Sequence, residues 1–144
     1  MALATGSSLG PYEILSTLGT GGMGEVYLAH DVRLRRKVAL KVLRNAPEAH
    51  DSTRRRFGKE AQTVSALNHP HIISVFDVGH FDGLDFIAME YVEGRTLRAM
   101  LAHGAVEFKS ALDIVAQAAS GLAAAHDAHV VHRDIKPENL IVSG

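Results

Sequence analysis

Apolar residues in the first two thirds of the chain occur in short runs whose length suits β-strands. The runs are bounded by Gly, Pro or polar residues, and they occupy residues 12–18, 25–29, 38–43, 72–78 and 84–92. Between the third run and the fourth, residues 51–67 carry apolar side chains at steps of three and four, which predicts an amphipathic helix. The pattern therefore predicts five strands with one helix after the third.

The last third of the chain is predicted to begin with two helices. Residues 96–103 suit a short helix, and residues 108–126 suit a long one whose apolar positions spread beyond one stripe, so we expect it to need partners on several sides. Residues 140–143 begin a further strand. Residues 1–11 carry Gly, Ser and Thr without periodicity, and we expect them to form a mobile N-terminal leader.

A single cation interrupts the third apolar run. Lys41 lies among five apolar residues, and an ammonium that is dry and unpaired there would cost several kcal/mol, so Lys41 either reaches water or meets an anion. Glu60 falls inside the apolar stripe of the helix predicted at residues 51–67, which turns its carboxylate toward the core side. We therefore predict that Lys41 and Glu60 form a pair.

The first two runs are joined by a Gly-x-Gly-x-x-Gly motif at Gly19, Gly21 and Gly24. A phosphate-binding Walker loop requires Lys and then Ser or Thr after the last glycine, where this chain has Glu25 and Val26. A dinucleotide-binding fold requires a helix at the same point, but the residues that follow favour a strand. A glycine-rich hairpin is the simplest interpretation, and a flexible hairpin tip without a ligand remains its alternative.

Residues 132–139, His-Arg-Asp-Ile-Lys-Pro-Glu-Asn, concentrate polar chemistry in a stretch that has little to bury. Pro137 removes a backbone donor and restricts the preceding residue, so we expect a rigid loop. Asp134 offers a carboxylate for a hydroxyl proton, Lys136 a cation for a developing phosphoryl charge, and Asn139 a neutral oxygen suited to a hard divalent metal. These are components of phosphoryl transfer, although a solvated charged loop is the plain alternative.

The glycine motif, Lys41, Glu60 and the polar segment at residues 132–139 follow one another along the chain. This order resembles that of the eukaryotic-type (Hanks-type) serine/threonine protein kinases, and the resemblance runs from about residue 12 to the end of the chain. Lys136 resembles the serine/threonine-directed form. The resemblance implies an α+β fold, with a small lobe of a five-stranded antiparallel sheet and one helix at residues 12–93. Residues 94–144 would supply the first helices and the catalytic loop of an incomplete large lobe. The family's Asp-Phe-Gly motif would lie beyond residue 144, so we interpret the chain as truncated after the catalytic loop.

The resemblance also implies that ATP and Mg²⁺ are the cofactors. Lys41 would grip the α- and β-phosphates and pair with Glu60, while the glycine loop would fold its backbone over the phosphates. The adenine ring would lie between Val26 and Ala39, with Met89 at the rear of its pocket. The implied nucleotide site comprises Leu18, Gly19, Thr20, Gly21, Gly22, Met23, Gly24, Val26, Ala39, Lys41, Glu60, Met89, and the backbone at Glu90 and Val92.

The implied activity is transfer of the ATP γ-phosphate to a Ser or Thr hydroxyl of a protein substrate. Asp134 would act as the base or hydroxyl-orienting group, Lys136 would be catalytic, and Asn139 would be both catalytic and a metal ligand. We expect this fragment alone to be weak or inactive as an enzyme. One alternative is a non-catalytic module of kinase fold that binds nucleotide or a partner. Another is a small-molecule phosphotransferase of related fold, which Lys136 and the complete glycine loop disfavour.

Composition excludes several other classes of function. Lys and Arg number 15 against 16 Asp and Glu, so no excess of positive charge indicates a nucleic acid or an anionic membrane as partner. The absence of cysteine excludes a disulfide framework. The first residues lack the basic region and long apolar run of a signal peptide, and the chain has no apolar run of about eighteen residues, so we expect no membrane segment within this chain and a cytoplasmic location. Nine histidines invite a metal interpretation, but no acidic partner is spaced to complete a zinc site.

Overall fold

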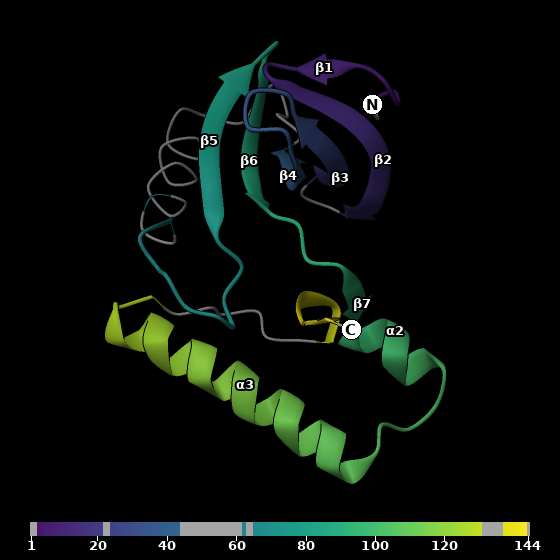
Figure 1. The fold of residues 1–144 in the computed structure, drawn as a ribbon, viewed down its shortest axis with the longest axis vertical. Helices are drawn as coiled ribbons and strands as arrows, with labels where there is room; N and C mark the ends of the chain where they lie inside the picture. The colour runs from purple at the N-terminus through teal and green to yellow at the C-terminus, as the bar shows by residue number, and fades with distance from the viewer. Residues whose placement is uncertain (1–2, 22–23, 44–61, 63–64, 131–136, 144) are drawn as a thin grey trace. The chain divides into compact units, whose positions relative to one another are not determined.

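The computed structural model describes residues 3–21, 24–43, 62, 65–130 and 137–143, and Figure 1 shows them as a coloured ribbon. The chain divides into two compact units. Unit 1 contains Met1–Ala66 and Ser74–Tyr91, and unit 2 contains Leu67–Ile73 and Val92–Gly144. The helix predicted at residues 51–67 lies almost entirely outside the described residues.

Unit 1 is built on one antiparallel sheet, which Figure 1 shows as strongly curved. Its strands are β1 (Ser8–Leu9), β2 (Tyr12–Gly21), β3 (Gly24–Asp31), β4 (Arg36–Leu43), β5 (Val75–Phe81) and β6 (Leu84–Glu90). Their order across the sheet is β1-β2-β3-β4-β6-β5, and every neighbouring pair is antiparallel. The five predicted strands are present in this sheet, and β1 adds a sixth.

Strand β1 lies in the stretch that was expected to be a mobile leader. It pairs with the start of β2, and backbone hydrogen bonds join Gly6 N to Ile14 O at 2.8 Å and Ile14 N to Ser7 O at 2.9 Å. Leu9 is only 1% exposed and belongs to the core. Ordered structure therefore begins before residue 12. Residues 8–9 form a strand because their backbone groups hydrogen-bond to β2, although the sequence there shows no apolar period.

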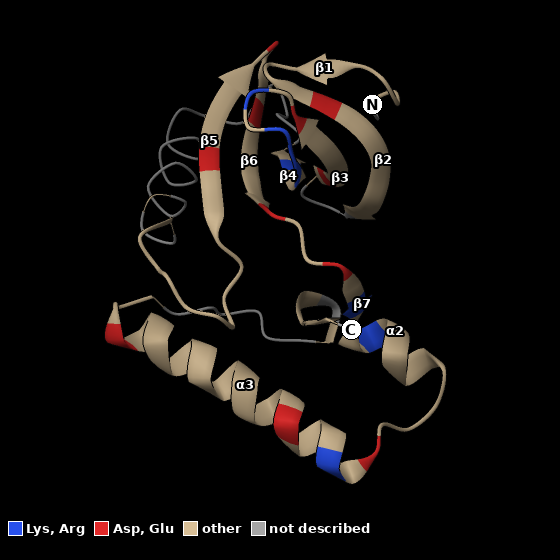
Figure 2. Ribbon diagram, in the orientation of Figure 1, with Lys and Arg blue, Asp and Glu red and all other residues tan. Residues whose placement is uncertain are grey.

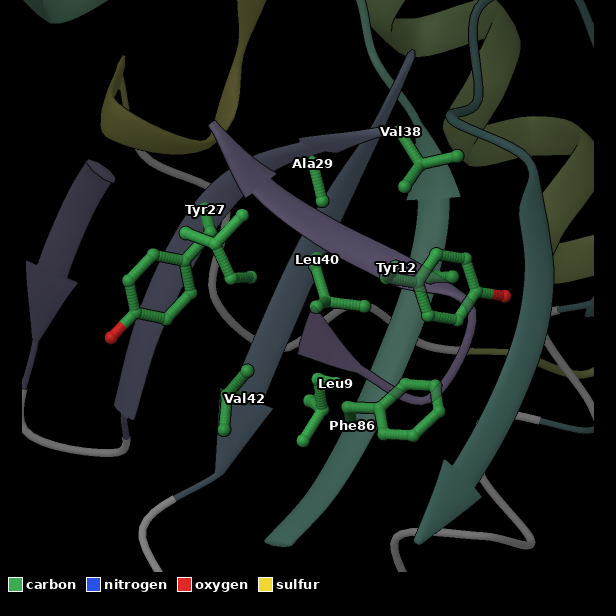
Figure 3. Packing of buried hydrophobic residues seen from close by; sticks show 10 residues of the cluster. Leu9, Tyr12, Tyr27, Ala29, Val38, Leu40, Val42 and Phe86 are labelled. Carbon is green, nitrogen blue, oxygen red and sulfur yellow. The ribbon is translucent and has the colours of Figure 1, made fainter. Parts of the chain in front are cut away.

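The hydrophobic core covers one face of the sheet. On β4, Val38, Leu40 and Val42 are at most 3% exposed, as expected for alternate residues that point to the same side of a strand. Burying a side chain such as that of Leu40 contributes about 1.5–3 kcal/mol. Figure 3 shows how these side chains pack. The remaining members of the cluster are Leu9, Tyr12, Ile14, Tyr27, Ala29, Phe86 and Ala88.

Strand β5 begins and ends later than the run at residues 72–78 predicted. Gly79, the residue that follows the predicted run, lies inside the strand, where it is paired with Phe86. A Cβ on Gly79 would lie 2.6 Å from Cζ of Phe86, so the glycine makes room for this buried ring. The turn itself consists of Asp82 and Gly83, with φ angles of 51° and 78°, which is the geometry of a two-residue hairpin.

Unit 2 contains β7 (Gly94–Thr96), α2 (Leu97–Ala102), α3 (Phe108–Asp127), the 3₁₀ turn η1 (Pro137–Asn139) and β8 (Ile141–Ser143). Thr96 caps α2 by accepting a hydrogen bond from the amide of Ala99 at 3.0 Å. Both predicted helices are present within a residue of their expected bounds. Strand β7 was not predicted, and it pairs antiparallel with β8. No helix among the described residues is long and apolar enough to cross a bilayer.

Candidate active site

Residues predicted to contact nucleotide lie on the face of the sheet opposite the core. The register places Val26 and Ile87 on either side of Lys41, and one row further on it places Leu28 and Met89 on either side of Ala39. Directly opposed residues in an antiparallel sheet project to the same face. Val26, Ala39, Lys41 and Met89 therefore share one surface. Ala39 is 9% exposed and the others are half-buried.

The predicted glycine-rich hairpin is formed by the end of β2 and the start of β3. Cross-strand pairs join Gly19 to Val26, Thr20 to Glu25 and Gly21 to Gly24. Leu18, at its base, is 46% exposed. Gly22 and Met23, at the tip, lie outside the described residues.

Two glycines of this motif have different structural surroundings. Gly24 has a φ of 147°, and a Cβ there would overlap the carbonyl oxygen of Val42 and lie 3.1 Å from its carbonyl carbon. Gly24 thus lets β3 approach β4 closely. Gly19 has no positive φ, and no heavy atom of the described residues lies within 4 Å of the position its Cβ would take. The described residues therefore require a glycine at position 24 and leave space at position 19.

The end of β6 is held by Ser74. The Glu90 amide donates to the Ser74 carbonyl oxygen at 2.8 Å, and the Ser74 amide donates to Oε1 of Glu90 at 3.2 Å. Both the backbone and the side chain of Glu90 are therefore fixed where the predicted adenine-binding segment begins. Val92, the last predicted nucleotide contact, belongs to unit 2 and is half-buried.

Of the predicted catalytic residues, only Asn139 is described. It is exposed at the end of η1, and Asp134 and Lys136 lie outside the described residues, as does Glu60 of the predicted Lys41 pair. The residue after Asn139 is fixed, because the Leu97 amide donates to the Leu140 carbonyl oxygen at 2.8 Å.

Strand β7 anchors the chain that follows the predicted catalytic loop. Gly94 is paired with Ser143, and a Cβ on Gly94 would overlap the carbonyl oxygen of Val142 and lie 2.8 Å from its carbonyl carbon. Sequence reasoning missed this role, because Gly94 lies between the run at residues 84–92 and the helix predicted at residues 96–103 and was assigned to neither. A close backbone approach leaves no signal in a single sequence other than the glycine itself.

A polar network joins distant strands in unit 1. The Tyr12 hydroxyl donates to Oδ2 of Asp77 at 2.8 Å, and the Arg33 guanidinium lies 3.7 Å from Asp77 and 3.6 Å from Asp31. Burial, and then the hydrogen bond to Asp77, raises the pKa of Tyr12 above its usual range. Burial alone would raise the pKa of Asp31, but hydrogen bonds from the Leu34 and Arg33 amides and the nearby guanidinium charge lower it on balance. Figure 2 shows how acidic and basic residues are distributed along the chain.

Comparison with known proteins identifies the family of the chain. Residues 12–144 match the protein kinase domain family, and the chain belongs to that family. It is 47% identical over 134 residues to the serine/threonine-protein kinase PrkC of Bacillus subtilis, covering 92% of this chain and 21% of PrkC. It is 45% identical over 141 residues to the serine/threonine-protein kinase PknD of Mycobacterium tuberculosis, covering 96% of this chain and 21% of PknD.

A solved structure shows the same fold. The kinase domain of Mycobacterium tuberculosis PknI is 39% identical, superposes with a TM-score of 0.85, and is matched over 99% of this chain and 58% of that domain's chain. The predicted α+β fold of a kinase small lobe with part of a large lobe is thereby confirmed. The chain spans about a fifth of the length of the two curated relatives and somewhat more than half of the solved chain.

Proposed function

We propose that this chain is the nucleotide-binding part of a serine/threonine protein kinase, which transfers the γ-phosphate of ATP to a Ser or Thr hydroxyl of a protein. The observation that carries the proposal is the shared surface of Val26, Ala39, Lys41 and Met89 beside the glycine hairpin. A flat apolar ring would fit against Val26, Ala39 and Met89. Lys41 shares a row with Val26 and lies one row nearer the hairpin than Ala39 and Met89, where the phosphates that follow the ring would lie.

The chemistry of the described residues supports ATP with Mg²⁺ as the ligand. Space at Gly19 allows backbone amides of the hairpin to approach phosphate oxygens, and the Lys41 cation would neutralise part of their charge. The Glu90 amide already donates to Ser74. Glu90 would therefore contact adenine through its carbonyl oxygen, which would accept a hydrogen bond from the base. The exposed Asn139 side chain offers the neutral oxygen that Mg²⁺ accepts, and the bound ion would offset charge on the phosphates.

The remaining chemistry falls to the predicted catalytic loop. Asp134 would orient the substrate hydroxyl and receive its proton, and Lys136 would stabilise negative charge that develops on the transferred group. In this proposal residues 12–93 form the small lobe and residues 94–144 begin the large lobe. The strand pairing of β7 with β8 would hold the end of the catalytic loop at Leu140.

Lys41→Met tests the nucleotide site, and Lys37→Met is its matched control. Lys37 lies four residues earlier on β4, on the same face, and is exposed. We expect MgATP to raise the Tm of the parent and of Lys37→Met, and to leave the Tm of Lys41→Met unchanged, because only Lys41 would contact phosphate. Equal stabilisation of the two variants by ATP would refute the assigned role of Lys41.

Transfer of labelled γ-phosphate to a general protein substrate separates the enzyme from its alternative. An Asp134→Asn variant that keeps ATP binding and loses transfer would support the kinase proposal. ATP binding without transfer by the parent chain would favour the non-catalytic binding module.

A further inference from the structure

The turn between β3 and β4, together with the first two residues of β4, presents only basic and apolar side chains. This basic turn is residues 32–37, and all six are exposed: Val32, Arg33, Leu34, Arg35, Arg36 and Lys37. Figure 2 colours the basic residues of this connection blue. In the whole chain 15 Lys and Arg are balanced by 16 Asp and Glu, so overall composition conceals this local concentration of positive charge.

A buried carboxylate fixes the shape of the basic turn. Asp31 is only 2% exposed, and its Oδ1 accepts hydrogen bonds from the Arg33 amide at 2.9 Å and the Leu34 amide at 3.3 Å. The Asp31 carbonyl oxygen also accepts the Arg35 amide at 2.8 Å. The backbone is thus held from inside the protein, and the side chains of the turn are presented outward.

Two apolar side chains alternate with the cations of the basic turn. Val32 is 52% exposed and Leu34 is 59% exposed. A single exposed apolar residue is ordinary, but here two of them project from a fixed turn whose other exposed residues are all basic. The combination of a cationic surface with projecting apolar groups is what binds proteins to the surface of an anionic lipid bilayer.

The four cations differ in how they are held. The Arg33 guanidinium lies 3.6 Å from the Asp31 carboxylate, and the Arg36 guanidinium lies 3.8 Å from the centre of the Phe76 ring. Arg35 and Lys37 make no ion pair with any residue that the structure describes. Their charges are therefore the ones that can be removed without disturbing a contact within the described part of the protein.

We propose that the basic turn is a docking surface for an anionic lipid bilayer. Val32 and Leu34 would enter the boundary between head groups and acyl chains, and the cations would meet the lipid phosphates. A second copy of this chain is a poorer partner, because two basic turns placed against each other would bring like charges together. Six consecutive exposed residues also form a projection, whereas a peptide ligand is held in a groove.

Three variants separate the charge of the basic turn from its apolar contacts. Arg35→Gln combined with Lys37→Gln removes two cations and keeps long polar side chains. Leu34→Ser removes an apolar side chain that lies mostly in water, so the stability of the chain should not change. Arg95→Gln combined with Lys109→Gln, at exposed positions of unit 2, changes the net charge equally and is the matched control.

Cosedimentation of the whole 144-residue chain with lipid vesicles tests the docking surface. We expect binding to vesicles of equal parts phosphatidylglycerol and phosphatidylcholine, weakened by added salt, and no binding to phosphatidylcholine alone. Loss of the two cations should weaken binding about 25-fold, because each cation near an anionic surface contributes about fivefold. Leu34→Ser should weaken binding severalfold, and the control variant should bind like the parent.

Three results would overturn this proposal. One is a parent chain that binds neither kind of vesicle, or binds both equally. Another is the same loss of binding in the control variant, which would show a general effect of net charge. The third is concentration-dependent sedimentation without vesicles that Leu34→Ser abolishes, because a second copy would then cover the basic turn.

Thermal unfolding without lipid checks that each variant is folded, and each Tm should equal that of the parent. The Leu34 variant and the double variant are measured separately, so either decides the matter if the other unfolds. None of these measurements involves ATP, so failure of the proposed function and failure of the docking surface would be seen independently.

Discussion

Replacing single glycines of the glycine motif should separate the requirements of folding from those of nucleotide binding. Gly24→Ala introduces a methyl group that overlaps the Val42 carbonyl oxygen, on a residue whose φ is 147°. Gly19→Ala introduces the same methyl group where no described heavy atom lies within 4 Å. We therefore expect Gly24→Ala to destabilise the chain and Gly19→Ala to leave its stability unchanged.

The size of the effect at Gly24 follows from two costs. An L residue forced into this backbone conformation loses about 1–3 kcal/mol. The methyl would also lie 3.1 Å from the Val42 carbonyl carbon and 3.2 Å from Cα of Leu43, where carbon atoms prefer about 3.5–4.0 Å, so β4 must retreat at a further cost of about 1–3 kcal/mol. A loss of 2 kcal/mol would lower the Tm of a chain this long by roughly 4–8 °C. At Gly19 the change should stay within about 0.5 kcal/mol.

Thermal unfolding with and without MgATP measures both effects. Without nucleotide, Gly24→Ala should unfold several degrees below the parent, and Gly19→Ala should unfold with it. With MgATP, Gly19→Ala should gain less stability than the parent, because its methyl group keeps the backbone away from the phosphates. A Gly24→Ala variant with the parent's Tm would refute the close approach of β3 to β4. Equal destabilisation by both substitutions would refute the distinction between the two glycines.

Three further substitutions test other parts of the structure. Tyr12→Phe removes the donor to Asp77 and should lower the free energy of unfolding in urea by about 1 kcal/mol, and an equal loss in an Asp77→Ala background would contradict the bond. Asp31→Asn removes a carboxylate whose pKa is low in the folded state, so its deficit in unfolding free energy should be complete above about pH 4 and shrink as the pH falls further; a deficit that is constant down to pH 2 would contradict this. Gly94→Ala should speed amide exchange in β8 about tenfold, because the methyl group displaces the Val142 carbonyl; unchanged exchange there would show that β7 does not anchor β8.

Sequence reasoning succeeded where a local pattern determines the structure. The apolar run at residues 38–43 is strand β4, and the apolar positions at residues 108–126 are helix α3. Lys41 was singled out because it interrupts an apolar run, and it lies half-buried on the face opposite the core. Whether it pairs with Glu60 stays a prediction.

The features that sequence reasoning missed depend on contacts between distant segments. Leu9 is one apolar residue without a period, and it becomes core because β1 pairs with β2. Gly79 and Gly94 both lie just outside the predicted strands, but each is a strand residue whose missing side chain leaves room for a distant group. A glycine that permits close packing and a glycine that ends a strand look the same in one sequence.

Side chains alternate along β4, so this one strand supplies residues both to the core of unit 1 and to the opposite face of the sheet, which carries Lys41. A shift of this strand by one position would turn the Lys41 ammonium toward the hydrophobic core and Leu40 toward the opposite face. Misaligned chains would thus lose both stability and the position that we propose for the Lys41 charge. The burial of Leu40 in the core thus also fixes the face on which Lys41 lies.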